Sequence, residues 1–107
     1  MIVTEEECDK AVDFIRDNAP VVANAKGELV YLESFGKSLK ATLMKHSGES
    51  SAAAQEREAY ASPKWVEHCE KLRDATVAYE LVRGMVNAAS MKLEIWRSES
   101  ANNRKNF

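Results

Sequence analysis

The chain has 107 residues, of which 45% are hydrophobic and 30% are charged, and its formal net charge is −2; this composition excludes a wholly disordered chain. Two prolines and four glycines are the strong helix breakers, so intrinsic propensity favours an all-α protein. No stretch approaches the roughly 18 consecutive apolar residues of a membrane span, and the first residues lack the basic and then apolar pattern of a signal peptide, so we expect a cytoplasmic protein.

A short first helix is predicted over residues 5–18. Thr4 and Glu7 have the spacing of a capping box, and the acids between them suit the positive end of a helix dipole. The helix is expected to end before Pro20, because proline disfavours helical geometry in the preceding residue. The outer face of this helix is acidic, which fits a solvated surface or a surface for a basic partner protein.

A second helix is predicted over residues 20–46, with apolar positions in alternating steps of three and four. Gly36 lies on this stripe, where glycine is about 1 kcal/mol less favourable than alanine. The bulky neighbours Tyr31 and Phe35 favour a close approach of another helix at this point. The stripe consists of Val22, Ala25, Leu29, Leu32, Gly36, Leu39, Leu43 and His46.

Two further helices are predicted after a break near Gly48, which suits the left-handed end of a helix. One spans residues 52–60. The other spans residues 63–98, because a serine and then Pro63 form a cap followed by proline in the first helical position; residues 99–107 are expected to fray. This last helix carries its own stripe: Trp65, His68, Leu72, Ala75, Tyr79, Val82, Val86, Ala89, Leu93 and Trp96.

The two long helices predict one helical domain over residues 1–107, an antiparallel, coiled-coil-like hairpin with the two short helices packed at its ends. The last helix has more apolar surface than one shorter partner covers. We therefore expect a homo-oligomer. The seam of that oligomer is assigned to the larger side chains of the last helix: Trp65, Leu72, Tyr79, Val82, Val86, Leu93 and Trp96.

The residue patterns favour no enzymatic activity and no bound metal or cofactor. His46, His68, Cys8 and Cys69 are the strongest metal-ligand types, but none of their spacings is that of a zinc site. No nucleophile elbow, phosphate-binding loop or dinucleotide-binding glycine pattern occurs. We interpret these histidines and cysteines as structural residues.

Basic residues are more informative. Lys37, Lys40 and Lys45 lie in a stretch without acids, and Arg97 and Arg104 lie near the aromatic residues of the C-terminal region, Trp96 and Phe107. Positive charge interleaved with aromatic rings is typical of surfaces that bind single-stranded nucleic acid, since phosphates attract cations and bases stack on rings. The same residues also fit the solvated faces of ordinary helices, so both interpretations stay open.

Three segments, residues 32–44 (LESFGKSLKATLM), 54–61 (AQEREAYA) and 94–98 (EIWRS), resemble a group of small phage and prophage proteins. Those proteins tend to be encoded among DNA replication and recombination genes. In layout they are similar to the UvsY-type recombination mediators of T-even phages, oligomeric helical proteins that help to load a recombinase onto single-stranded DNA. The similarity covers about residues 20–104. It implies an oligomer that contacts single-stranded DNA through Lys37, Lys40, Lys45, Arg57, Arg97 and Arg104.

The leading hypothesis is therefore a non-enzymatic, oligomeric accessory protein of phage DNA recombination or replication. It would contact single-stranded DNA, a single-strand-binding protein or a recombinase. The alternative is a helical protein–protein interaction or regulatory module of a phage that binds no nucleic acid. Salt-dependent binding to oligonucleotides separates the two.

Overall fold

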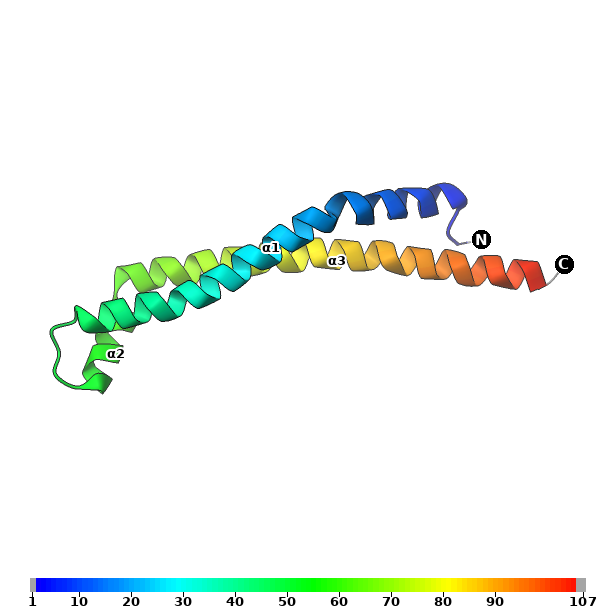
Figure 1. The fold of residues 1–107 in the computed structure, drawn as a ribbon. Coiled ribbons are helices and arrows are strands. Elements are labelled where there is room, and N and C mark those ends of the chain that lie inside the picture. Colours follow the sequence, from blue (N-terminus) through cyan, green and yellow to red (C-terminus); the bar gives the residue numbers. More distant parts are fainter. Residues whose placement is uncertain (1, 106–107) are drawn as a thin grey trace. The chain divides into compact units, whose positions relative to one another are not determined.

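The computed structural model describes residues 2–105, which form three helices and no strand (Figure 1). Helix α1 spans Glu5–Lys45, α2 spans Ala52–Ala61 and α3 spans Pro63–Lys105. The prediction of an all-α protein is confirmed. Within the described residues, none of these helices combines the length and the apolar composition needed to cross a bilayer.

Helix α1 begins at the cap that the sequence predicts. The Glu7 backbone N–H donates to Thr4 Oγ1 at 3.1 Å, and the Thr4 hydroxyl donates to the Glu7 carboxylate at 3.3 Å. In a standard capping box the backbone N–H of the first residue donates to the carboxylate, whereas here the Thr4 hydroxyl does so. The acidic first turn lies at the positive end of the helix dipole, where negative charge is stabilising.

The predicted break before Pro20 is wrong, because α1 continues through this residue as one helix. A stripe of mainly apolar positions in steps of three and four runs past the proline, and all of its positions from Cys8 to Leu43 are buried or half-buried. Proline removes the backbone hydrogen bond that the Arg16 carbonyl would accept, but Pro20 and Arg16 lie on the exposed side of the helix, where solvent is available. Continuous burial of the stripe outweighs the local preference for a break. Its members are Cys8, Ala11, Ile15, Asn18, Val22, Ala25, Leu29, Leu32, Gly36, Leu39 and Leu43.

The connection between α1 and α3 follows the predicted signals closely. Gly48 has a φ of +76°, in the left-handed region that favours glycine. Ser51 caps α2 by accepting the Ala54 backbone N–H at 3.1 Å. The Ser62 carbonyl accepts the backbone N–H of Trp65 at 3.0 Å, so this residue ends α2 and begins α3.

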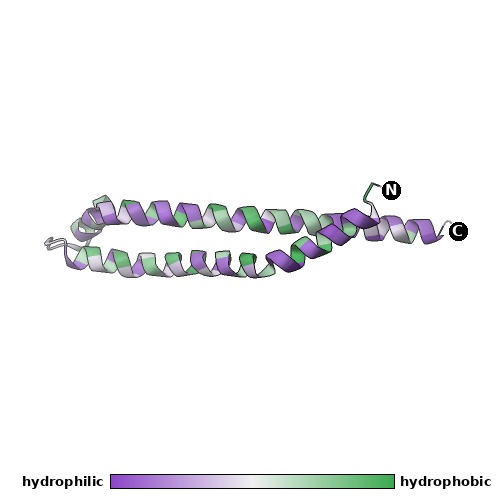
Figure 2. Ribbon diagram, turned by 90° about the horizontal axis from the view of Figure 1, so that it is seen from above, coloured by the Kyte–Doolittle hydropathy of each residue, from purple (hydrophilic) through white to green (hydrophobic). Residues whose placement is uncertain are grey.

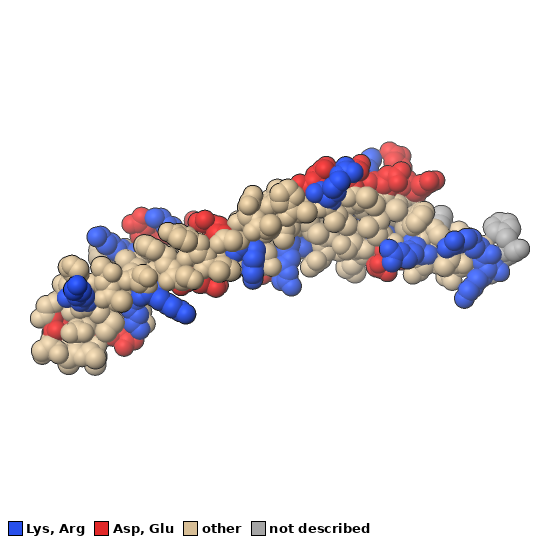
Figure 3. Space-filling model, in the orientation of Figure 1, with Lys and Arg blue, Asp and Glu red and all other residues tan. Residues whose placement is uncertain are grey.

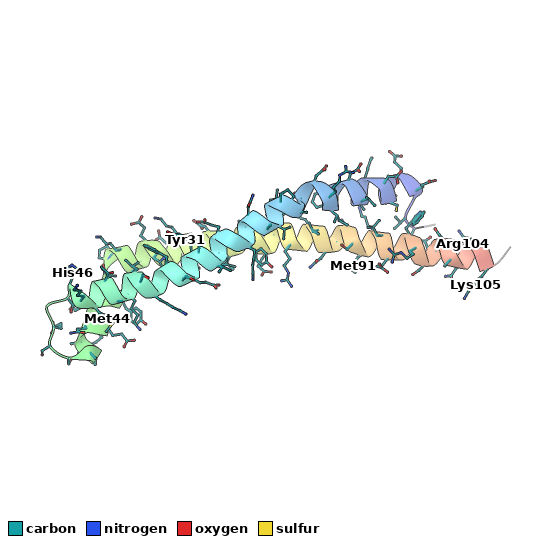
Figure 4. All side chains as sticks on the ribbon, viewed as in Figure 1. Tyr31, Met44, His46, Met91, Arg104 and Lys105 are labelled. Carbon is teal, nitrogen blue, oxygen red and sulfur yellow. The ribbon has the colours of Figure 1, made fainter. Side chains whose placement is uncertain are left out.

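The predicted fraying after residue 98 is wrong for residues 99–105, which continue α3. The Glu99 carboxylate accepts the backbone N–H of Ile2 at 2.9 Å and that of Val3 at 3.2 Å. Arg104 and Lys105 occupy the last turn, where positive charge complements the helix dipole (Figure 4). The hydrogen bonds from Ile2 and Val3 stabilise the end of α3, and the spacing of apolar residues does not predict them. Residues 106 and 107 of the predicted tail lie outside the described residues.

The internal contacts divide the chain into two units, each formed by parts of both long helices. Unit 1 contains the segment up to Asn24 and the segment from Glu80 onward; unit 2 contains Ala25–Tyr79. In unit 2 the end of α1 and the start of α3 run antiparallel and are joined through α2, as the hairpin prediction requires. In unit 1 the start of α1 likewise runs antiparallel to the end of α3.

Burial follows the predicted stripes, but few side chains are deeply buried. All ten predicted stripe positions of α3 are buried or half-buried, and those of α1 are too, apart from His46, which lies beyond the last helical residue and is exposed. Hydrophobic residues nevertheless occur along the whole of α1 and α3 (Figure 2). Many of the large ones are exposed: Ile2, Val12, Val21, Val30, Tyr31, Phe35, Tyr60, Val66, Val77, Leu81, Met85, Met91 and Ile95.

Gly36 lies at a close approach of α1 to α3 in unit 2, as its sequence context predicts. A Cβ atom built on Gly36 would lie 2.7 Å from His68 Nε2. The His68 ring is buried and lies between the rings of Phe35 and Trp65, at centroid distances of 5.8 and 5.4 Å. The ring therefore has little freedom to move away from an added methyl group.

Replacing Gly36 with alanine is expected to destabilise the fold. Overpacking a buried position typically costs about 1–3 kcal/mol, and the better helix propensity of alanine offsets about 1 kcal/mol of this. Urea unfolding, followed by circular dichroism at one protein concentration, measures the change. Gly27→Ala is the matched control, because an added Cβ there meets no described atom within 4 Å, so this variant should be stabilised. A Gly36→Ala protein as stable as the Gly27→Ala protein would contradict the tight packing.

Candidate nucleic-acid interface

Two of the predicted basic residues and two aromatic residues meet in a shallow hollow of unit 2, called here the basic–aromatic hollow. Helix α1 supplies Lys37 and Lys40, α2 supplies Tyr60 and α3 supplies Trp65. The hollow has a volume of about 320 Å³. Its lining consists of Glu33, Gly36, Lys37, Lys40, Tyr60, Trp65, His68, Cys69 and Leu72.

Lys40 is held by two neighbours at the edge of this hollow. Its Nζ lies 3.1 Å from Glu56 Oε1 and 4.9 Å from the centre of the Tyr60 ring. The first contact is an ion pair between α1 and α2, and the second is a cation–π contact. Both partners of the ion pair are partly exposed, so solvent screens the attraction between them.

The protonation of this pair reflects the same contacts. The Tyr60 hydroxyl first, and the Glu56 carboxylate second, raise the pKa of Lys40. The hydrogen bond from Lys40 lowers the pKa of Glu56. Because the pKa of Glu56 is lowered in the folded state, its contribution to stability is present above the ordinary pKa of 4.5 and is lost as the pH falls through the lowered value. At neutral pH the Lys40 charge is therefore already partnered within the chain.

The aromatic rings near the hollow form a row that continues across α3 and along α1. Tyr60 and Trp65 have ring centroids 5.2 Å apart with planes inclined by 59°. Beyond Trp65 the row continues through the buried His68 to Phe35 and then to Tyr31, whose ring stacks on that of Phe35 at 6.1 Å. Tyr60, with 43% of its surface exposed, is the ring beside Lys40 that is open to solvent.

The other four predicted DNA-contacting residues lie outside this hollow. Lys45 and Arg57 are exposed elsewhere on unit 2. Arg97 and Arg104 belong to unit 1, where Arg97 forms an ion pair with Glu94 at 3.2 Å. Within unit 1, basic side chains gather over the end of α3 and acidic ones over the start of α1 (Figure 3). Phe107, predicted to accompany Arg104, lies outside the described residues.

Sequence reasoning missed Trp65 and Tyr60 in the lining of the hollow and Glu56 beside it. Trp65 was assigned to the stripe and seam of the last helix, and Tyr60 and Glu56 were placed only within the short helix predicted over residues 52–60. The pairing of Glu56 with Lys40 joins residues 16 positions apart on different helices, and no local spacing rule predicts such a contact. The row of aromatic residues on α1 was visible, but its continuation through His68 was not.

The seven residues predicted as an oligomer seam all lie half-buried within the single chain. Tyr79, for example, lies under Lys26 of α1, whose Nζ is 5.0 Å from the ring centre. These side chains thus belong to the packing between α1 and α3. A seam between copies that uses Trp65, Leu72, Tyr79, Val82, Val86, Leu93 and Trp96 stays a prediction.

Comparisons with protein-family models, with curated proteins and with solved structures found no match to this chain. The residues of the hollow and their geometry therefore carry the functional argument.

Replacing Lys40 with methionine is expected to raise the pKa of Glu56 toward 4.5, because the hydrogen bond that lowers it is removed. A titration of the Glu56 carboxyl carbon by NMR measures the shift. Lys45→Met, which removes a charge from the same helix away from Glu56, should leave this pKa unchanged. Equal shifts in both variants would show that general charge, rather than the direct contact, sets the pKa.

Proposed function

We propose that this chain is a non-enzymatic, self-associating helical accessory protein of phage DNA recombination or replication. In this proposal it contacts single-stranded DNA, or a protein bound to that DNA. The observation that carries the proposal is the basic–aromatic hollow, in which Lys37 and Lys40 lie beside Tyr60 and Trp65. Lysine side chains suit phosphates, and an exposed ring suits an unpaired base, whose faces stack without regard to sequence.

The hollow explains how the contact would be made. A phosphate near Lys40 would compete with the Glu56 carboxylate, 3.1 Å from the lysine nitrogen. A base would stack on the exposed Tyr60 ring. Because one of the two lysines is already neutralised, a single copy would bind weakly. Several copies on one strand would raise the overall affinity through effective concentration.

The resemblance to UvsY-type mediators adds support from a second direction. Two of the three resembling segments, residues 32–44 and 54–61, contribute residues to the hollow. The first supplies Lys37 and Lys40, and the second supplies Tyr60. Two of the segments that resemble the phage proteins therefore supply the lysines and the exposed ring of the basic–aromatic hollow.

A protein-binding module of a phage, without nucleic-acid binding, is the second candidate function. It is favoured by the many exposed hydrophobic side chains and by the acidic start of α1. In that case Lys40 and Glu56 would serve only to hold α1 against α2. The acidic segment would then suit a basic partner surface.

The double variant Lys37→Glu and Lys40→Glu is expected to reduce the affinity for an oligothymidylate by at least about tenfold, because two attractive charges become repulsive. Fluorescence anisotropy of a labelled strand at low and moderate salt measures this affinity and its salt slope. The matched control is Arg73→Glu with Arg83→Glu, the same charge change at exposed positions outside the described hollows. It should lose much less affinity. No binding by the unmodified protein at low salt would favour the second candidate.

Glu56→Gln provides a test in the opposite direction. Removing the carboxylate frees Lys40, so the affinity for the same strand should rise several-fold and the salt slope should steepen. Glu58→Gln, which removes an acid from the same helix outside the hollow, controls for the change in net charge. Equal gains in the two variants would argue against a specific role for the Lys40 pair.

A further inference from the structure

An exposed apolar stripe runs along α3 in unit 1, beside the stripe that packs on α1; two of its members, Met85 and Ala88, also line a hollow with Ala11 and Phe14 of α1. We call it the free stripe; it consists of Leu81, Met85, Ala88, Met91 and Ile95. The exposed fractions of its large side chains are 63% for Leu81, 48% for Met85, 65% for Met91 and 39% for Ile95 (Figure 4 labels Met91). Residues three and four positions apart share one face of a helix, so these side chains form a continuous surface.

The spacing of the free stripe is symmetric about Ala88. Met85 and Met91 lie three positions before and after it, and Leu81 and Ile95 lie seven positions before and after it. Read in the reverse direction, the stripe therefore has the same pattern of large and small side chains. This is the pattern that an isologous contact needs, because a two-fold axis brings the same patch of both subunits together.

An antiparallel pairing about Ala88 would match each side chain with a suitable counterpart. Leu81 would pack against the partner's Ile95, and Met85 against the partner's Met91. At the centre, the small side chain of Ala88 would allow the two helices to approach closely. Gly84 lies on the same face, and a Cβ built there meets no described atom within 4 Å. A second helix that approaches this face would meet no side chain at Gly84.

The charged side chains of this segment lie mainly on the other faces of α3. Within one chain, Arg83 pairs with Glu80 at 3.3 Å and Arg97 pairs with Glu94 at 3.2 Å, and all four side chains are more than half exposed. At about 100° per residue, Arg83, Glu94 and Arg97 lie roughly 140°, 120° and 180° around the helix from Ala88. The apolar contact would therefore leave both ion pairs in solvent.

The area of this surface suits a weak, reversible dimer. Burying a large aliphatic or methionine side chain removes on the order of 100 Å² of apolar surface. The four large side chains would bury about 800 Å² over both copies, which is below the roughly 1,200 Å² at the lower end of stable specific interfaces. A dimer that forms at tens of micromolar (about 10–100 μM) is expected.

We propose that two copies of this chain dimerise through the free stripe, with α3 antiparallel to α3 and the two-fold axis at Ala88. This inference rests on the proposed function, which requires self-association, and it names the surface through which the copies would associate. It assigns the contact between copies to the exposed face of α3, while Val82, Val86 and Leu93 remain packed within the chain.

Disulfide trapping tests the geometry in a background with Cys8→Ser and Cys69→Ser, whose helicity is first checked by circular dichroism. Ala88→Cys lies on the proposed axis and should form a covalent dimer rapidly under mild oxidation. Leu81→Cys alone should not, because its counterpart would lie about 21 Å away, 14 residues along the helix. Ser90→Cys, exposed on another face of α3, is the control for random collision. Rapid trapping through Leu81→Cys would indicate parallel helices, and equal trapping at all three positions would indicate no specific contact; either result overturns the proposal.

Sedimentation equilibrium tests the energetics without cysteines. Met91→Lys should raise the dimer dissociation constant at least about tenfold while circular dichroism stays unchanged, because it places two charges in the apolar contact. Val77→Lys, at a hydrophobic site of unit 2 that is 60% exposed against 65% for Met91, should leave it unchanged. A monomeric wild-type protein at 100 μM, or a dimer unaffected by Met91→Lys, would refute the proposal. Oligonucleotide anisotropy on the same proteins separates the two hypotheses: a dimer that binds no DNA removes the proposed function but leaves this interface standing.

Discussion

The packing of α1 against α3 along matched apolar stripes is the interaction on which the other features of this chain depend. The stripe of α1 continues from Cys8 to Leu43 without a break, and the stripe of α3 continues from Trp65 to Trp96. Few of these side chains are deeply buried, so the stabilisation is spread over many small contributions. This distribution explains why α1 remains one helix at Pro20. A break there would not supply the hydrogen bond that proline lacks, and it would interrupt burial on both sides.

The same packing positions the basic–aromatic hollow. At Gly36 the absence of a side chain lets α1 approach His68, and this closeness brings Lys37 and Lys40 of α1 near Trp65 of α3. The short helix α2 then places Tyr60 and Glu56 beside Lys40. His68 Nδ1 is buried with no hydrogen-bond partner among the described residues, which is unfavourable for a polar atom. The His68 ring therefore packs between Phe35 and Trp65 at the cost of a hydrogen bond to its Nδ1 atom.

Helix α3 carries more apolar surface than α1 covers, and this surplus has a distinct organisation. Val82, Val86, Ala89 and Leu93 serve the internal packing, whereas Leu81, Met85, Met91 and Ile95 remain exposed on another face. Exposed hydrophobic side chains in a symmetric row are characteristic of a contact between copies. The free stripe belongs to unit 1 and the hollow to unit 2, so the proposed dimer contact and the proposed contact with DNA use separate residues.

Sequence alone determined the helical class, the cap at Thr4, the turn at Gly48, the start of α3 at Pro63 and the internal stripes, because these follow from backbone chemistry and residue spacing within a few turns. It also identified Gly36 as a point of close approach, since the bulky Tyr31 and Phe35 lie shortly before it. It was wrong at Pro20 and after residue 98, where local signals for ending a helix compete with burial and with hydrogen bonds from Ile2 and Val3 to Glu99. Only the tertiary structure decided that Lys40 meets Glu56 and Tyr60, and that its charge is already partnered. Such contacts join residues from different helices, and their geometry depends on how the connection folds back rather than on any local pattern.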